Sequence, residues 1–186
     1  MTLAFGYRGR LRKPRECGRT TMIDTGLPFG LFADVIQCHA HYVDAVKFGW
    51  ATAVLTQALP KKIALLRSMG IDCWFGGTFF EIAWGKGKLS DYIAWIRQLG
   101  VMQIEVSDGA VALNAADRAR LIRTLSAGFT VISAVGKKAV DALPEPAEWA
   151  ASVRADLAGR GSGTAGPYDS DGRLRLDLIE AIFASI

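Results

Sequence analysis

The chain has 186 residues, of which 51% are apolar, and a formal net charge of +4. This length and apolar content allow one sizeable core, so a single main domain is expected. No apolar run approaches the ~20 residues of a membrane helix, and the N-terminus lacks the pattern of a signal peptide. Three cysteines without metal-type spacing argue against a disulfide framework or a zinc cluster. We therefore expect a soluble, cytoplasmic protein.

Positive charge is concentrated in a basic N-terminal arm, residues 1–18, which precedes the domain predicted for residues 19–186. The arm contains Arg8, Arg10, Arg12, Lys13 and Arg15. One interpretation is a solvated terminus, and the alternative is a contact site for an anion or a nucleic acid. Because aromatic residues are not interleaved and no nucleic-acid-binding motif is found, we expect no nucleic-acid partner.

Five short apolar runs predict β-strands at residues 21–24, 45–48, 73–75, 102–106 and 129–135. The runs begin about 24 to 29 residues apart, which is the size of one βα unit. Amphipathic stretches between them predict helices at residues 31–43, 61–69, 91–99 and 115–127. Ser90 and Asn114 are the expected N-caps of the last two helices, and Gly100 and Gly128 follow their ends. This alternation predicts a parallel sheet covered by helices.

The alternation changes after the fifth run. Residues 145–158 and 174–184 predict helices, but no strand-like run is found between them, at residues 159–172. Gly161, Gly163 and Gly166 spell G-x-G-x-x-G, yet the motif follows a predicted helix rather than a strand, so we reject a dinucleotide site. A closed eightfold barrel typically takes ~250 residues. We therefore predict about five parallel strands plus helices.

Polar residues recur at the C-terminal ends of the predicted strands, where parallel α/β folds bind ligands. Lysines and glycines at these ends suit a phosphorylated or carboxylated substrate. The carboxylates Asp24, Glu81 and Glu105 are hard oxygen ligands that suit Mg²⁺. Lys47 and Glu105 each interrupt an apolar run, where an unpaired charge is costly to bury. The alternative for these two residues is a structural ion pair between strands.

At the same residues the chain resembles the phosphosulfolactate synthase family. Its order and spacing match from about Lys13 to the end of the chain. The matching segments are KPRECG (13–18), MIDTG (22–26), VDAVKFGWAT (43–52), GGTFFE (76–81), IEVSDG (104–109), VGKK (135–138) and SGTAGPYDSDGRLRLDLIEAI (162–182).

The resemblance implies a (β/α)₈ TIM barrel and a Mg²⁺-dependent lyase that adds sulfite to phosphoenolpyruvate, giving (2R)-phospho-3-sulfolactate on a route to coenzyme M or sulfolactate. Lys137 and Lys47 are the expected catalytic residues: Lys137 would protonate the carbanion and Lys47 would bind substrate anions. Glu105 with Asp24 or Glu81 would hold the metal. The other expected substrate-binding residues are Gly76, Gly77, Ser107, Arg160, Ser162 and Gly163.

Some residues depart from the family pattern. The family usually has glycine at Ala51, glutamate at Ala134 and a second glutamate at Gly161. The stretch covering the sixth strand and the region of the last two strands are expected to be missing. These departures predict an incomplete barrel that forms a dimer or other homo-oligomer, aggregates or lies open, with a weakened metal site. Two other functions stay open: a non-catalytic remnant that binds a phosphorylated ligand or a partner, and another phosphate-handling barrel enzyme such as an aldolase.

Overall fold

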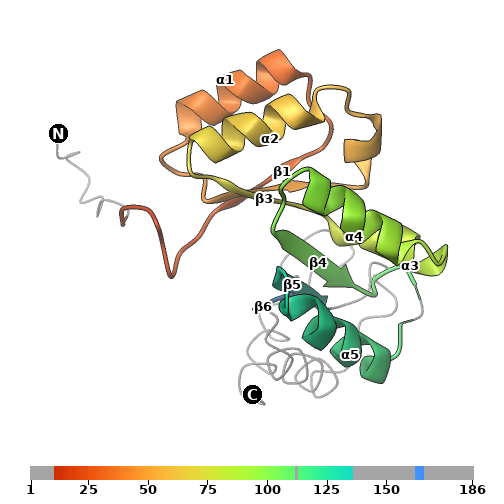
Figure 1. Ribbon diagram of the computed structural model, residues 1–186. Helices are drawn as coiled ribbons and strands as arrows, with labels where there is room; N and C mark the ends of the chain where they lie inside the picture. The colour runs from red at the N-terminus through yellow and green to blue at the C-terminus, as the bar shows by residue number, and fades with distance from the viewer. Residues whose placement is uncertain (1–10, 112, 136–161, 166–186) are drawn as a thin grey trace, which may run out of the picture.

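The structure is a computed structural model that describes residues 11–111, 113–135 and 162–165. Strands and helices alternate along most of this length (Figure 1). The elements are β1 (Thr21–Asp24), α1 (Phe29–His39), β2 (Ala45–Phe48), the 3₁₀ helix η1 (Thr52–Leu55), α2 (Leu59–Ser68), β3 (Asp72–Phe75), α3 (Gly77–Gly85), α4 (Leu89–Gln98), β4 (Gln103–Ser107), α5 (Ala115–Ser126), β5 (Thr130–Val135) and β6 (Ser162–Ala165).

The strands form two parallel three-stranded sheets, in the orders β1-β2-β3 and β4-β5-β6. In Figure 1, α1 and α2 lie side by side over the first sheet, and α5 lies beside β5 in the second. Helices α3 and α4 connect the two sheets and lie next to β4. This architecture confirms the predicted α/β class with parallel strands.

Most predicted elements agree with the structure to within two or three residues, because apolar runs and caps mark them clearly. Asn114 caps α5 as predicted, since its side chain accepts a hydrogen bond from the amide of Asp117 at 2.8 Å. The N-cap prediction for Ser90 is wrong: α4 begins earlier, with Lys88 at its N-cap. Helix α3 was not predicted, because two glycines lie at its start.

The prediction that residues 159–172 contain no strand is also wrong, because β6 pairs with β5 there. Register places Ser162 beside Ile132 and Ala165 beside Val135. The SGTA sequence carries no apolar signature, so pattern alone does not identify it as a strand. The segment is a strand because its backbone pairs in parallel with that of β5. The described chain therefore has six strands rather than about five.

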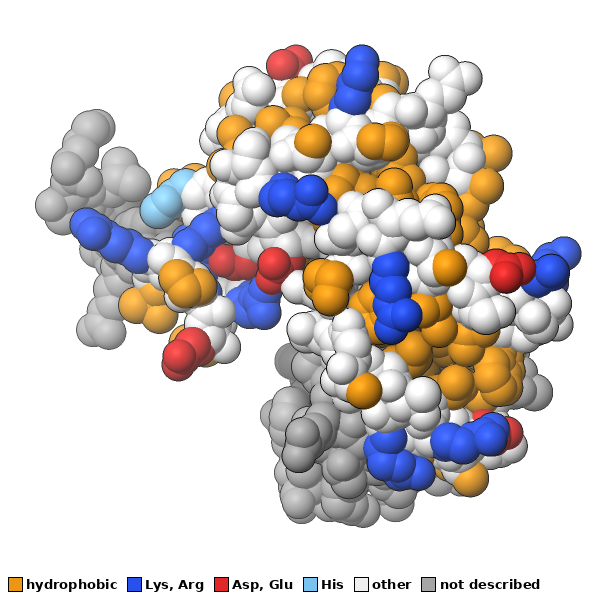
Figure 2. Space-filling view, viewed as in Figure 1, with side chains coloured by type: hydrophobic (Ala, Val, Ile, Leu, Met, Phe, Trp, Pro, Cys, Tyr) orange, Lys and Arg blue, Asp and Glu red, His pale blue; other side chains and the backbone are white. Residues whose placement is uncertain are grey.

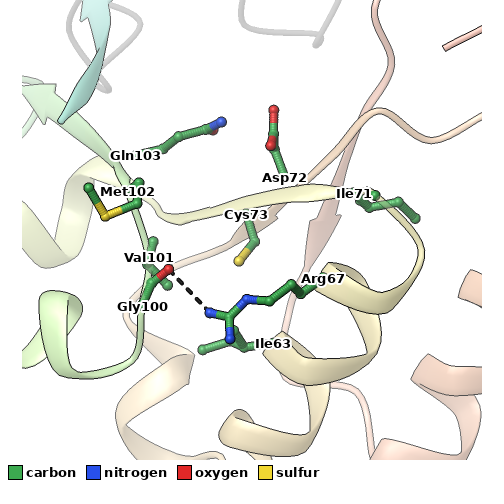
Figure 3. A pocket seen from close by; sticks show the side chains of 10 residues that line it. Ile63, Arg67, Ile71, Asp72, Cys73, Gly100, Val101, Met102 and Gln103 are labelled. Carbon is green, nitrogen blue, oxygen red and sulfur yellow. Dashed lines mark hydrogen bonds between the residues drawn. The ribbon is translucent and has the colours of Figure 1, made fainter. Parts of the chain in front are cut away.

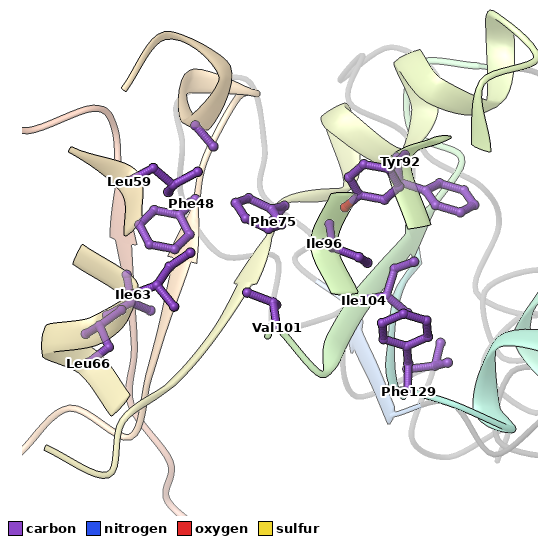
Figure 4. Packing of buried hydrophobic residues seen from close by; sticks show 14 of the residues in the cluster. Phe48, Leu59, Ile63, Leu66, Phe75, Tyr92, Ile96, Val101, Ile104 and Phe129 are labelled. Carbon is purple, nitrogen blue, oxygen red and sulfur yellow. The ribbon is translucent and has the colours of Figure 1, made fainter. Parts of the chain in front are cut away.

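The main core lies between the sheets and their helices. Stacked rings of Phe48 and Phe75, whose centroids are 5.5 Å apart, join strands β2 and β3, and Trp95 of α4 packs on Phe75 at 4.9 Å. Figure 4 shows this packing continuing through Ile96 and Ile104 into the second sheet. One apolar core thus spans both sheets and fixes the strand ends relative to each other.

The predicted arm is partly packed against the domain. Arg15 is only 6% exposed, and its guanidinium contacts Asp44 at 2.6 Å and the carbonyl of His41 at 2.6 Å. The second carboxylate oxygen of Asp44 accepts a hydrogen bond from the amide of Thr20. Arg15 therefore fastens the chain ahead of β1. In the described part, no helix has the length and apolar character needed to cross a membrane.

Candidate functional site

The strands present two different faces, because successive side chains in a strand point to opposite sides. One face packs against the helices and includes Phe48, Phe75 and Ile104. The opposite face is called the inner face here. Register aligns its members across each sheet: Ile23, Lys47 and Trp74 in the first, and Glu105 with Ile132 in the second.

The main feature of the inner face is an ion pair between Lys47 of β2 and Glu105 of β4. Lys47 Nζ lies 2.8 Å from Glu105 Oε1. The Glu105 side chain is 4% exposed, whereas that of Lys47 is 28% exposed. The interpretation of an ion pair between strands is confirmed. The Lys47 side chain nonetheless keeps access to solvent, so it can also meet an anionic ligand.

Two further donors hold Glu105. The indole Nε1 of Trp74 donates to Oε2 at 2.8 Å, and the backbone amide of Gly77 donates to Oε1 at 2.9 Å. Gly77 is the first residue of α3, so the carboxylate also lies at the positive end of that helix. Strands β2 and β3 of the first sheet are thus joined to β4 of the second through one buried carboxylate.

Gly76 and Gly77 make this arrangement possible by their lack of a side chain. A Cβ at Gly77 would lie 2.3 Å from Cβ of Ser107 and 2.8 Å from Glu105 Oε1. A Cβ at Gly76 would lie 2.9 Å from Cε of Lys47. Both glycines were predicted as substrate-binding residues. The structure gives them a packing role: they let α3 approach the lysine–glutamate pair.

Ser107 and Glu81 form a second buried group beside the first. Glu81 Oε1 accepts hydrogen bonds from the Ser107 hydroxyl and, at 3.1 Å, from the Gly109 amide, while Oε2 accepts one from the Ala110 amide at 2.9 Å. Glu81 is 1% exposed. This carboxylate therefore holds the loop that follows β4.

Asp24, in contrast, belongs to the helix-covered face. Its Oδ2 lies 2.6 Å from Nζ of Lys62 on α2, and its Oδ1 accepts hydrogen bonds from the amides of Gly26 and Leu27. Both charged side chains are almost fully buried, at 1% for Asp24 and 0% for Lys62. Asp24 thus fixes the turn after β1 and does not join Lys47 on the inner face.

The predicted magnesium ligands can now be tested against these contacts. Asp24, Glu81 and Glu105 each accept hydrogen bonds on both carboxylate oxygens. Among the described residues, no three His, Cys, Asp or Glu side chains form a group that could hold a metal ion. Asp24 lies on the face opposite Glu105, so these two do not combine in one site. The pairing of Glu105 with Glu81 stays a prediction, since Mg²⁺ often takes only one or two protein carboxylates together with substrate oxygens.

Pattern reasoning missed three residues that organise the site. Trp74 was treated only as part of an apolar strand. Lys62 lies at a core position of α2, between the buried Leu59 and Leu66, and this helical spacing was the available signal. Arg118 of α5 is 5% exposed.

Arg118 joins three elements near the C-terminal ends of the strands. It contacts Asp108 Oδ1 at 2.8 Å, the hydroxyl of Ser133 at 2.7 Å and the carbonyl of Ala134 at 2.8 Å. It thereby ties the loop after β4 to the end of β5. Arg118 is thus the ion-pair partner of Asp108.

Some predicted site residues lie outside the described residues or only partly within them. Lys137 and Arg160 are outside, so their predicted roles stay predictions. Ser162 and Gly163 lie in β6, where register places them beside Ile132 and Ser133. Because Ile132 pairs in turn with Glu105, Ser162 occupies the register row of the inner face that contains Glu105.

A cavity of about 320 Å³ lies at the opposite, N-terminal ends of β3 and β4 (Figure 3). Arg67 enters it but donates to the carbonyls of Leu99 and Gly100, at 3.3 and 3.2 Å. Burial raises the pKa of Cys73 in its wall to about 12, which keeps the thiol protonated and unreactive near neutral pH. This cavity does not offer the cationic rim expected for a phosphorylated substrate.

An apolar groove of about 610 Å³ lies on the outer surface, between η1, α2, α3 and α4. Figure 2 shows apolar side chains gathered over α3 and α4 on this side of the molecule. Tyr92 in its wall is 4% exposed, and burial, followed by the nearby negative charge of Glu105, raises the pKa of its hydroxyl. Lys47 and Glu105 are not among the residues that line this groove.

Comparison with known proteins identifies relatives over most of the chain. A family described as (2R)-phospho-3-sulfolactate synthase matches residues 8–186. Phosphosulfolactate synthase of Bacillus subtilis (strain 168) is 34% identical over 187 residues, covering 95% of this chain and 74% of that protein. Phosphosulfolactate synthase of Methanothermobacter thermautotrophicus is 37% identical over 183 residues, covering 90% and 71%.

Among solved structures, the carboxyl transferase domain of Rhizobium etli pyruvate carboxylase is similar in fold. With 3-bromopyruvate bound, it gives a TM-score of 0.55 at 16% sequence identity, over 89% of this chain and 30% of that one. With oxamate and biotin, the TM-score is 0.57 at 15% identity, over the same shares of the two chains. At such identity the likeness bears on the fold alone, and it agrees with a TIM-barrel-derived architecture that is incomplete in the described residues.

Proposed function

The chain belongs to the (2R)-phospho-3-sulfolactate synthase family, and we propose that it adds sulfite to phosphoenolpyruvate to give (2R)-phospho-3-sulfolactate. The family match over residues 8–186 is the observation that carries this proposal. The Lys47–Glu105 pair supports it, because it places a cation on the inner face near the strand ends where ligands of this fold bind.

The proposed reaction forms one bond and needs no leaving group. A sulfur lone pair of sulfite attacks the terminal CH₂ carbon of phosphoenolpyruvate, and a carbon–sulfur bond forms. The electron pair of the C=C bond moves onto the carbon that bears the phosphate, next to the carboxylate. A proton then adds to that carbon, and Lys137 is the proposed donor.

The proposed role of Lys47 is electrostatic. Both substrates are anions, so binding them together requires cations that are fixed before the substrates arrive. The contact with Glu105 holds the Lys47 ammonium at one place on the inner face, while 28% of its side chain stays exposed. We propose that it binds a carboxylate or phosphate oxygen of phosphoenolpyruvate.

Magnesium dependence stays part of the prediction, but no step above relies on the ion. The three carboxylates predicted as ligands are engaged by protein donors. If Mg²⁺ takes part, its chemistry would be to stabilise negative charge on the substrate carboxylate. Assaying the purified chain with added Mg²⁺ and with excess EDTA tests the requirement directly.

The test of the main proposal is turnover by the purified 186-residue chain. Phosphoenolpyruvate and sulfite are incubated with the protein, and phosphorus and proton NMR follow substrate loss and formation of a phosphorylated sulfonate. We expect product only when both substrates and the protein are present. Lack of product from a chain whose circular dichroism and unfolding transition show a folded protein would contradict the proposal.

One observation favours the alternative of a non-catalytic relative that binds a phosphorylated ligand. Ala134 pairs in register with Ser107, two residues beyond the Glu105–Ile132 pair. A glutamate at position 134 would therefore add a carboxylate to the same strand face as Glu105, and this chain lacks it. Binding of phosphoenolpyruvate in calorimetry without turnover would support the alternative, whereas measurable product formation would exclude it.

A further inference from the structure

Trp74 contacts the lysine–glutamate pair in a way that its apolar character does not explain. It lies on β3 in the register row of Lys47 and is 7% exposed, in a small apolar cluster with Ala45 and Ile132. Its indole N–H donates to Glu105 Oε2 at 2.8 Å. Tryptophan has this single donor and no acceptor, so the orientation of the contact is unambiguous.

We propose that Trp74 is a positioning residue: it orients Glu105 so that the carboxylate holds the Lys47 ammonium in place for the anionic substrate. This inference rests on the proposed function. Trp74 touches neither substrate nor reacting atoms in this account. It acts through Glu105, and Glu105 acts through Lys47.

The contacts of Glu105 explain how one hydrogen bond from Trp74 can fix the orientation of the carboxylate. Glu105 Oε1 already accepts hydrogen bonds from Lys47 and from the fixed backbone amide of Gly77. The contact from Trp74 to Oε2 fixes the second oxygen, and with both oxygens held the carboxylate cannot rotate. Lysine has a long flexible stem, so its ammonium is only as well placed as the carboxylate that binds it.

A purely structural role is the competing explanation. Trp74 belongs to the first sheet and Glu105 to the second, so their hydrogen bond also joins the sheets. If this were all, loss of the N–H would lower stability but would leave kcat/KM of the folded protein unchanged. The two roles therefore predict different effects on kcat/KM when the N–H of Trp74 is removed.

The experiment removes the N–H in two ways. Trp74→Phe keeps an aromatic ring, and replacement of Trp74 by 3-benzothienylalanine keeps the volume while sulfur replaces the N–H. Trp95→Phe is the matched control, because Trp95 packs on Phe75 and Phe79 through its ring. We expect both changes at position 74 to lower kcat/KM for phosphoenolpyruvate about tenfold, the effect of one hydrogen bond to a charged group, and Trp95→Phe to leave it nearly unchanged.

A double-mutant cycle separates positioning from structure. If Trp74 acts through Glu105, then Trp74→Phe combined with Glu105→Gln loses little more activity than Glu105→Gln alone. Additive losses would overturn the proposal. Unchanged kcat/KM in the benzothienylalanine protein would overturn it as well, because that protein keeps the packing of the indole.

A readout without turnover keeps this inference separate from the proposed function. Acetic anhydride labels neutral amines, and mass spectrometry compares labelling of Lys47 with that of the exposed Lys61 in the same protein. Because a loosened Glu105 holds the Lys47 ammonium less well, we expect severalfold faster labelling of Lys47 in the position-74 variants than in wild type or Trp95→Phe. Equal labelling would overturn the role of Trp74, whereas faster labelling in a chain without turnover would uphold the contact and refute only the reaction.

Discussion

Two lysine–carboxylate pairs each take one residue from the neighbouring strands β1 and β2 of the first sheet, and they lie on opposite faces of that sheet. Asp24 and Lys62 lie beneath the helices, with side chains 1% and 0% exposed. Glu105 and Lys47 lie on the inner face, and the Lys47 side chain is 28% exposed. In the first pair, the ammonium also lies 4.8 Å from the ring centre of Phe32, which closes it in further.

The position of a charge along a strand does not decide its role. Asp24 and Lys47 both lie within the last two residues of their strands, as a ligand-binding rim requires. Adjacent strand positions point to opposite faces, so one of them meets helix α2 and the other meets the inner face. The exposed fraction of the lysine side chain distinguishes the two pairs: buried Lys62 has a structural role, whereas partly exposed Lys47 can bind a ligand.

Loss of the buried Asp24–Lys62 pair should lower the free energy of unfolding most. Lys62→Met leaves the Asp24 carboxylate without its cation in a fully buried place, which costs about 3–5 kcal/mol of the free energy of unfolding. Urea denaturation followed by circular dichroism measures this loss. As a control, Lys62→Met combined with Asp24→Asn should recover stability, because the amide oxygen of asparagine can still accept from Gly26 and Leu27. A loss under 1 kcal/mol in the single variant would contradict the structural role.

Loss of the Lys47–Glu105 pair should lower activity more than stability. Under the proposed function, Lys47→Met should lower kcat/KM about a hundredfold, because one preorganised charge that meets the substrate is lost. Its free energy of unfolding should fall less than that of Lys62→Met, since Trp74 and Gly77 still donate to Glu105. Lys61→Met is the matched surface control on α2. A large loss of stability with full activity would place Lys47 with Lys62 as a structural residue.

The Lys47–Glu105 pair needs the space that Gly77 leaves by its lack of a side chain. Gly77→Ala puts a methyl group 2.3 Å from Cβ of Ser107, so α3 must move, at a cost of about 2 kcal/mol in unfolding free energy. Gly30→Ala in α1 is the matched control. A Cβ there meets nothing within 4 Å, and alanine favours a helix, so stability should be unchanged or rise. Equal effects at both positions would refute the close approach at Gly77.

The first five strands were predictable from their apolar runs, and β6 was not. The partnership of Lys47 with Glu105 was predictable because charges that interrupt apolar runs need partners. The bounds of β1 and β2 agree with the prediction residue for residue. The face of Asp24 was not predictable from its strand-end position alone; it depends on Lys62, whose helical spacing with Leu59 and Leu66 carried the only hint. Trp74 and Glu105 belong to different sheets and lie far apart in the sequence. No local sequence pattern therefore predicts their contact.

Changes in the loops that follow β1 and β2 should alter the free energy of unfolding least. After β1, the positive φ of +100° falls on Gly26, which tolerates it. After β2, it falls on Trp50 and Ala51, with φ of 47° and 58°. Since a left-handed conformation costs a residue with a Cβ about 1 kcal/mol, Ala51→Gly should raise the free energy of unfolding by about that amount. Gly26→Ala should lower it by a similar amount in the same urea titration. If Ala51→Gly were destabilising, its backbone would not be strained, and the flexibility of glycine in the unfolded chain would then dominate.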